Sequence, residues 1–158
     1  TKLMGSDISM MWGKFFADGS FDTLLKLCND KNNLTPLPDA VTGVMYNFRD
    51  GGKISYLIGL IFSASAEVPD GFHSFELPEG IITEAHITGE EYEIYSQGHQ
   101  LTVSAVEESD YNVDWENFYQ CEVYTDKRFQ DLKRAGEMIL TLDYYIPVVM
   151  KKNSIKRI

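Results

Sequence analysis

Residues 118–124 read Phe-Tyr-Gln-Cys-Glu-Val-Tyr, an aromatic-rich run with a single carboxylate near its centre. Aromatic residues favour strands, and the side chains of a strand alternate between its two faces. The alternation puts Glu122 on one face together with Phe118, Gln120 and Tyr124. A glutamate on an aromatic face is costly to bury unless a partner compensates its charge, and a cationic or hydrogen-bonding ligand is one such partner. The alternative is an exposed glutamate on an edge strand, which the strand taken alone favours.

The rest of the chain has the composition of one soluble domain. Its 158 residues are 44% hydrophobic and 24% charged, which is typical of a globular protein with a real core. We therefore expect a single domain over residues 1–158, with 151–158 as a basic, solvated tail. The formal net charge of −10 repels a phosphate backbone, so we expect no direct binding to nucleic acid.

The sequence also predicts a compartment. No apolar run approaches the roughly 18 residues that a membrane span needs, so we expect no membrane partner. Cys28 and Cys121 lie far apart and match no redox or metal spacing, and no export signal opens the chain. These features favour a reducing cytoplasm. The sequence begins at Thr1 rather than Met, so we also expect that it can be the detached part of a longer protein with a DNA-binding domain.

No motif for a cofactor or for catalysis stands out. The histidines His73, His86 and His99 lack the spacing of zinc ligands, and there is no Gly-x-Ser-x-Gly sequence or Walker loop. We therefore predict no metal, no cofactor and no catalytic residue that a motif identifies.

Hydrophobic spacing predicts helices and strands in a mixed order. The expected helices cover residues 7–16, 21–28, 90–109 and 126–136. The expected strands cover residues 41–48, 54–62, 81–88, 118–125 and 138–150, with a short extended segment at 72–77. The segment 90–109 is the most ambiguous, because Gly98 and the β-branched pair Thr102 and Val103 are poor helix formers.

This order predicts an α+β fold with a mostly antiparallel sheet and two main helices on one face. The chain runs helix, strand, strand and then strand, helix, strand, strand. One more strand before residue 7 would complete two copies of a strand-helix-strand-strand module, and residues 1–4 are the candidate end of that opening strand.

Several segments in this order resemble the GyrI-like small-molecule-binding domain, the effector-binding module of AraC-type and MerR-type multidrug regulators. The matching segments are Met11-Trp-Gly-Lys-Phe-Phe16, Val44-Met-Tyr-Asn-Phe48, Ile54-Ser-Tyr-Leu-Ile-Gly59, Val68-Pro-Asp-Gly-Phe72, Glu76-Leu-Pro-Glu-Gly80, Cys121-Glu-Val-Tyr124 and Tyr144-Tyr-Ile-Pro-Val148. The resemblance implies two pseudo-symmetric strand-helix-strand-strand modules with a ligand groove between them. It also implies that Glu122 engages cationic, lipophilic compounds. The chain departs from the family in its short opening segment and in a second helix without a late aromatic residue, for which Tyr95 is the candidate replacement.

The candidate ligand-binding residues are Glu122 and a set of aromatic side chains. Tyr145, which shares a strand face with Thr141 and Asp143, is slightly favoured over Tyr144 as an aromatic wall. Phe118 shares the predicted Glu122 face and is a second wall.

The other candidates come from the first half of the chain. Trp12 either stacks on a ligand or anchors the first helix. Tyr46 and Tyr56 lie on the first hairpin and either line the groove or pack in the core.

Three functions follow from these residues. The first is binding of small lipophilic or cationic molecules, either as the effector domain of a transcription regulator or as a free-standing sensor or sequestering protein. The second is hydrolysis of electrophilic small molecules on the same fold, with Glu122 as general base beside a tyrosine. The third is inhibition of another protein, as in family members that bind DNA gyrase.

Overall fold

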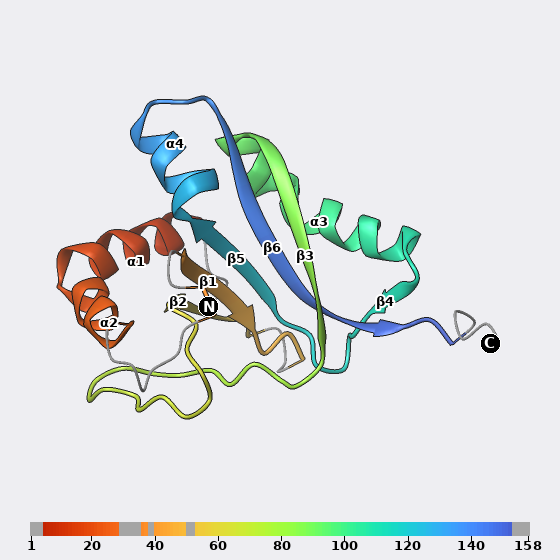
Figure 1. Ribbon diagram of the computed structural model, residues 1–158, viewed down its shortest axis with the longest axis horizontal. Coiled ribbons are helices and arrows are strands. Elements are labelled where there is room, and N and C mark those ends of the chain that lie inside the picture. Colours follow the sequence, from red (N-terminus) through yellow and green to blue (C-terminus); the bar gives the residue numbers. More distant parts are fainter. Residues whose placement is uncertain (1–4, 29–35, 38–39, 50–52, 153–158) are drawn as a thin grey trace.

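The computed structural model describes residues 5–28, 36–37, 40–49 and 53–152 (Figure 1). Four helical segments lie among them together with a π-helical turn, and the strands form one sheet. The four helical segments are α1 (Gly5–Ala17), α2 (Ser20–Cys28), α3 (Glu91–Glu108) and α4 (Asp131–Arg134), and the π-helical turn is η1 (Asp126–Gln130). The strands are β1 (Ala40–Tyr46), β2 (Ser55–Gly59), β3 (Ile81–Glu90), β4 (Tyr111–Val113), β5 (Gln120–Thr125) and β6 (Ile139–Met150).

All pairs in the sheet are antiparallel. The strand order is β2-β1-β5-β6-β3, and the short β4 pairs with the end of β6. The predicted hairpin is the β1–β2 pair, and the β1–β5 pair joins it to the second half of the chain. The α+β class with an antiparallel sheet is therefore confirmed.

The helices lie on one face of this sheet. Phe15 of α1, Leu24 of α2 and Ile94 of α3 belong to one buried cluster with Tyr124 of β5 and Tyr144 of β6. We call the sheet face that carries Tyr124 and Tyr144 the helix face. The prediction that the main helices share one face is confirmed.

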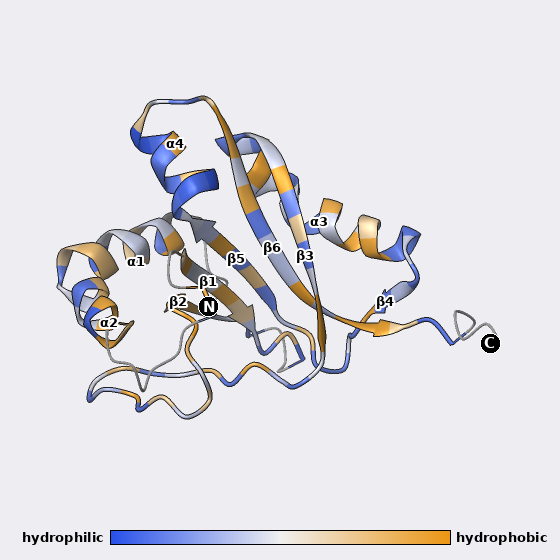
Figure 2. Cartoon of the chain, in the orientation of Figure 1, coloured by the Kyte–Doolittle hydropathy of each residue, from blue (hydrophilic) through white to orange (hydrophobic). Residues whose placement is uncertain are grey.

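The opposite face is covered by a long loop. Val44, Cys121 and Tyr145 form a second buried cluster, against which Phe75 and Leu77 pack from the segment between β2 and β3. We call this side the loop face. In Figure 2 hydrophobic and hydrophilic residues are mixed along β3, β5 and β6, whereas α4 is mostly hydrophilic, as expected for a short helix at the edge of the core.

Most expected elements are found, with shifted ends. The predicted strand at 54–62 ends at Gly59, the strand at 118–125 begins at Gln120, and the segment 72–77 forms no strand. The second module is present as β3, α3, β5 and β6, with β4 as an addition. The proposed end of an opening strand at residues 1–4 lies outside the described residues.

The ambiguous segment is a continuous helix, α3, because Gly98 meets a packing need. A Cβ atom at Gly98 would lie 2.3 Å from the ring of Tyr144, so only glycine lets α3 approach β6 this closely. The hydroxyl of Tyr144 donates a 2.7 Å hydrogen bond to the carbonyl of Ile94. This bond and the close approach fix α3 on the sheet.

Candidate ligand-binding site

Glu122 lies in the middle of the helix face. On β5 it stands opposite Gly43 of β1 and Tyr144 of β6. Helix α1 contacts β2, and helix α3 contacts β3 and β6, so Glu122 lies between the areas that these two helices cover. Its side chain is 12% exposed. The carboxylate is therefore largely shielded from water, where its charge is less screened than on the surface.

Two tyrosine hydroxyls hold the same oxygen of this carboxylate. Tyr56 of β2 and Tyr124 of β5 each donate a 3.1 Å hydrogen bond to Oε2 of Glu122. The indole Nε1 of Trp12 donates a 3.1 Å hydrogen bond to the hydroxyl of Tyr56. A chain of hydrogen bonds thus runs from α1 through β2 to the carboxylate.

A glycine makes the reach of Tyr56 possible. A Cβ atom at Gly43 would lie 2.2 Å from the Tyr56 hydroxyl oxygen and 3.2 Å from Cζ2 of Trp12. Because glycine has no side chain, the hydroxyl end of Tyr56 can lie over Gly43 of β1 and meet Glu122 on the next strand.

The second carboxylate oxygen faces a histidine. Nε2 of His99, on α3, lies 3.4 Å from Oε1 of Glu122. The His99 ring stands edge-on to Tyr144, with ring centroids 4.7 Å apart and an interplanar angle of 78°. Both ring nitrogens are buried, and neither makes a hydrogen bond within the described part of the chain.

The tyrosines around Glu122 are held in their neutral form. Burial raises the pKa of Tyr56, Tyr124 and Tyr144 well above the ordinary value, and the charge of Glu122 raises each further. These hydroxyls therefore remain hydrogen-bond donors at neutral pH and do not act as bases.

Glu122 thus has neutral partners rather than a cationic one. Within the residues that the structure describes, His99 is the only side chain able to carry positive charge within 4.0 Å of Glu122. Aromatic rings surround the group, and Trp12 stands edge-on to Tyr124 at a centroid distance of 5.1 Å and an angle of 72°. Such an arrangement can accept a cation, which the rings and the carboxylate would both attract.

A second buried carboxylate, on the loop face, is arranged differently. Asp143 of β6 is fully buried. Arg128 of η1 binds both of its oxygens, through a 3.1 Å bond from Nε to Oδ1 and a short bond from Nη2 to Oδ2. Nε2 of His86 lies 3.8 Å from Oδ1 of Asp143 and 2.9 Å from Oε1 of Glu84. The side chains of Glu84, His86 and Asp143 are close enough to hold a metal ion, but the guanidinium group already supplies the positive charge.

The structure brings Trp12 and Tyr56 together with Glu122 and separates the other candidates from it. Because Glu122 pairs with Tyr144 and Tyr145 is buried on the loop face, the structure does not support the slight preference for Tyr145 as an aromatic wall near Glu122. Tyr46 also packs in the loop-face cluster and stacks on Phe75 with ring centroids 4.3 Å apart.

Phe118 lies apart for another reason. It precedes the start of β5 and packs in a different cluster from Glu122. It packs against Phe48 and Trp115, with ring centroids 5.0 and 4.6 Å away, beside the cluster of Val106 and Ile146. This packing does not support the expectation that Phe118 forms a wall beside Glu122.

Sequence reasoning misses three contributors to the site. Tyr124 lies on the predicted face of Glu122, but the strand pattern assigns its hydroxyl no role. Tyr144 is considered as an aromatic wall, but Tyr145 is slightly favoured over it. His99 is overlooked because its spacing suits no metal. One signal is available in the sequence, since Tyr95 and His99 are four residues apart on a helix and so share a face.

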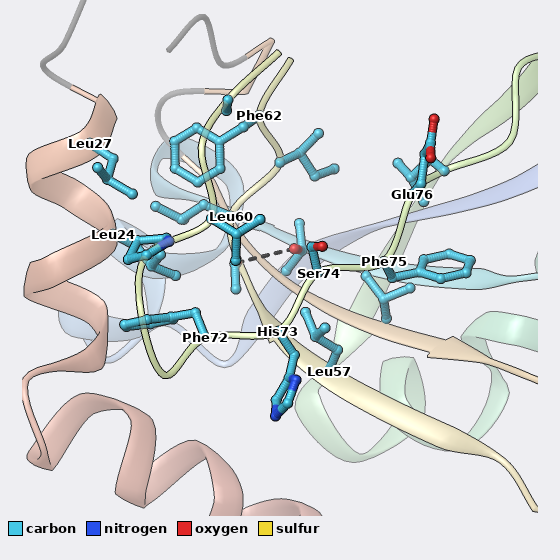
Figure 3. A pocket seen from close by; sticks show the side chains of 18 of the residues that line it. Leu24, Leu27, Leu57, Leu60, Phe62, Phe72, His73, Ser74, Phe75 and Glu76 are labelled. Carbon is cyan, nitrogen blue, oxygen red and sulfur yellow. Dashed lines mark hydrogen bonds between the residues drawn. The ribbon is translucent and has the colours of Figure 1, made fainter. Parts of the chain in front are cut away.

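A separate cavity of about 400 Å³ lies between α2, β2 and the segment between β2 and β3 (Figure 3). It is mainly apolar, with Leu24, Leu57, Leu60 and Phe72 pointing into it. Neither Glu122 nor Tyr56 lines it.

Residues 4–148 match a family model described as Cass2, integron-associated effector binding protein. The chain belongs to the Cass2 family. This is a GyrI-like effector-binding family, so the resemblance seen in the sequence is confirmed. No curated protein and no solved structure shows a significant match to the chain. Among the described helices of this Cass2 family member, none is long and apolar enough to cross a bilayer.

Proposed function

We propose that the protein binds lipophilic small-molecule cations at Glu122. It would do so as the effector domain of a transcription regulator, whose DNA-binding domain would lie elsewhere in the full-length protein, or as a free-standing sensor or sequestering protein. The observation that carries the proposal is a carboxylate with 12% exposure, held by neutral tyrosine hydroxyls, without a lysine or arginine partner among the described residues. The family description supports the binding of an effector.

Electrostatics favour a cation over a neutral or anionic ligand. A shielded carboxylate without a full counter-charge is costly to the free protein, and a bound cation removes that cost. Contacts of a cation with the faces of aromatic rings add about 0.5–2 kcal/mol each. The net charge of −10 raises the concentration of cations near the surface.

The ligand class is tested with a pair of ions of equal shape and opposite charge. Calorimetric titration with tetraphenylphosphonium should give saturable binding, whereas tetraphenylborate should not bind. Equal binding of the two ions would remove the electrostatic basis of the proposal.

The role of Glu122 is tested by Glu122→Gln, which keeps the size of the side chain and removes its charge. Tetraphenylphosphonium affinity should fall by about 1–3 kcal/mol, the range for loss of a charged hydrogen-bonding partner. The free energy of unfolding should hold or rise, because the variant no longer shields an uncompensated charge. Glu116→Gln, at an exposed loop position, makes the same change in net charge and is the matched control. Lower stability with unchanged binding would identify Glu122 as a structural residue instead.

One observation keeps hydrolysis as a second candidate function. The His99 imidazole beside the Glu122 carboxylate resembles a general-base pair, and Tyr56 is a neutral donor next to it. Water would add to an electrophilic carbon and pass one proton to His99, and the bond from that carbon to the leaving atom would break. The same proton would then pass from His99 to the leaving atom, which a tyrosine hydroxyl would hold by a hydrogen bond. Turnover of a reactive ester or a strained cyclopropane by the parent, lost in Glu122→Gln, would favour the enzyme over the sensor.

A further inference from the structure

The two oxygens of Glu122 have different surroundings. Both tyrosine hydroxyls bond to Oε2, from Tyr56 and Tyr124. Oε1 instead faces His99, whose Nε2 atom lies 3.4 Å away. A cation that approaches the side of the carboxylate away from the tyrosines must therefore meet Oε1, and it must do so beside His99.

The His99 ring lacks the hydrogen bonds that usually fix the charge state of a histidine. Both of its nitrogens are buried and without a hydrogen-bond partner within the described residues. The titratable groups that face it are Glu122 from β5 and Tyr144 from β6. Tyr95 lies one turn earlier on α3, and Tyr56 of β2 reaches the same carboxylate.

Of these groups, the tyrosines carry no charge, because burial raises the pKa of Tyr56, Tyr95 and Tyr144. Among the described residues that face His99, Glu122 is therefore the charged group with which a protonated His99 would interact. As an imidazolium, His99 would form an ion pair with Oε1 and act as an internal cation. As a neutral imidazole, it would leave the carboxylate without a counter-charge.

We infer that a proton on His99 and a bound cation compete for Glu122, so that cation binding releases a proton from His99. The inference rests on the proposed function, because it assigns the regulation of the same site. An imidazolium beside Oε1 repels an incoming cation and has already compensated the carboxylate. Tight binding of a cation therefore requires a neutral His99. The charge state of His99 sets the pH dependence of the cation affinity.

Linkage fixes the sign of the effect. The free protein holds the His99 proton more tightly than the complex does, so the cation affinity falls as the pH falls. For one released proton, the apparent dissociation constant of the cation rises up to about tenfold for each pH unit below the midpoint of the His99 titration. Above that range the affinity becomes independent of pH.

The experiment is a calorimetric titration of the full chain with tetraphenylphosphonium from about pH 5.5 to about pH 8, a range that spans the usual titration of histidine. Repeating it in buffers of different ionisation enthalpy gives the number of protons released. We expect weaker binding at low pH with release of up to one proton in the parent. In His99→Gln the affinity should be the same across this range, with no proton release.

The outcomes separate this inference from the proposed function. Binding that is independent of pH in the parent, or a pH dependence that persists in His99→Gln, overturns the inference and leaves cation binding in place. Absence of tetraphenylphosphonium binding at every pH overturns both.

A second measurement follows the proton on His99 itself. The ring-proton NMR signals of His99 report its charge state, with exposed His73 and His86 as internal references. At a fixed pH at which binding is weakened, saturating tetraphenylphosphonium should move the His99 signals toward those of a neutral ring and leave the references in place. Unchanged His99 signals in the saturated protein overturn the inference.

Discussion

Glu122 and Asp143 are two shielded carboxylates on neighbouring strands, and they face opposite sides of the sheet. Asp143 is bound by both arms of the Arg128 guanidinium, with His86 and Glu84 close by. Glu122 has two neutral hydroxyls and one histidine. The loop-face carboxylate thus has its counter-charge built into the fold. The helix-face carboxylate has no permanent counter-charge among the described residues. This is the property expected of a carboxylate whose counter-charge is a bound ligand.

The tyrosines give the largest expected difference between the two faces. The pKa values of Tyr56, Tyr124 and Tyr144 around Glu122 are raised beyond that of Tyr145 on the loop face, which burial raises to about 12. A raised pKa in the folded state contributes stability below about pH 10 that is lost as the pH rises, by about 1.4 kcal/mol per pH unit for each such tyrosine.

Urea unfolding at about pH 9 and about pH 11, on either side of the ordinary tyrosine pKa, measures this loss. The absorbance of the ionised phenol is a second signal. Tyr144→Phe should lose less stability than the parent between the two pH values, by roughly one tyrosine's share. If all tyrosines ionised at the higher pH while the protein stayed folded and equally stable, the expected loss of stability would be contradicted.

Removal of the counter-charge on the loop face should come next in size. Arg128→Met leaves Asp143 buried without the guanidinium group that binds both of its oxygens. Because Arg128 is itself 42% exposed, we expect a loss of about 2–3 kcal/mol, below the range for a fully buried pair. Chemical denaturation measures it, and Arg134→Met, at a side chain 67% exposed, is the control with a loss below about 1 kcal/mol. If Glu122→Gln destabilised the protein as much as Arg128→Met, the contrast between the two carboxylates would be lost.

Gly43→Ala should have the smallest effect on stability of the three changes but a large effect on ligand binding. In Gly43→Ala the new methyl group displaces the Tyr56 hydroxyl from Glu122, and we expect a cost of about 1 kcal/mol for the lost hydrogen bond. Tetraphenylphosphonium affinity should fall with it. Gly13→Ala, at an exposed position of α1, is the control, because a Cβ atom there would meet no other atom within 4 Å, and helix propensity predicts a gain of about 0.5–1 kcal/mol. Full affinity in Gly43→Ala would show that Tyr56 does not organise the site.

The fold is predictable because its signals are local. The periodicity of each segment indicates the elements and their order, and alternation correctly groups Glu122 with Tyr124 and Asp143 with Tyr145. The choice between Tyr144 and Tyr145 depends on which residue of β6 stands opposite Glu122, and this register is a property of two strands together. Sequence patterns within one strand do not contain it.

The role of His99 is hidden for a related reason. On α3 it is an ordinary helical residue, and it acquires a partner only because Gly98 lets the helix settle onto Tyr144. In the sequence the glycine is a weakness of the helix. In the structure it is what brings the ring close to β5, and only the packing partner reveals this.

The pairing of β1 with β5 also governs when the site can exist. Tyr56 and Glu122 are 66 residues apart in the chain, so Trp12, Gly43 and Tyr56 leave the ribosome long before their carboxylate partner is made. The hairpin of β1 and β2 closes a short loop, whereas the β1–β5 ladder must close a long one at a greater entropic cost. The ligand proposed to bind at Glu122 would therefore have no complete site in a partly synthesised or partly folded chain. Its binding free energy would be added only to the completed molecule, so the proposed effector would stabilise the finished protein and would not guide its folding.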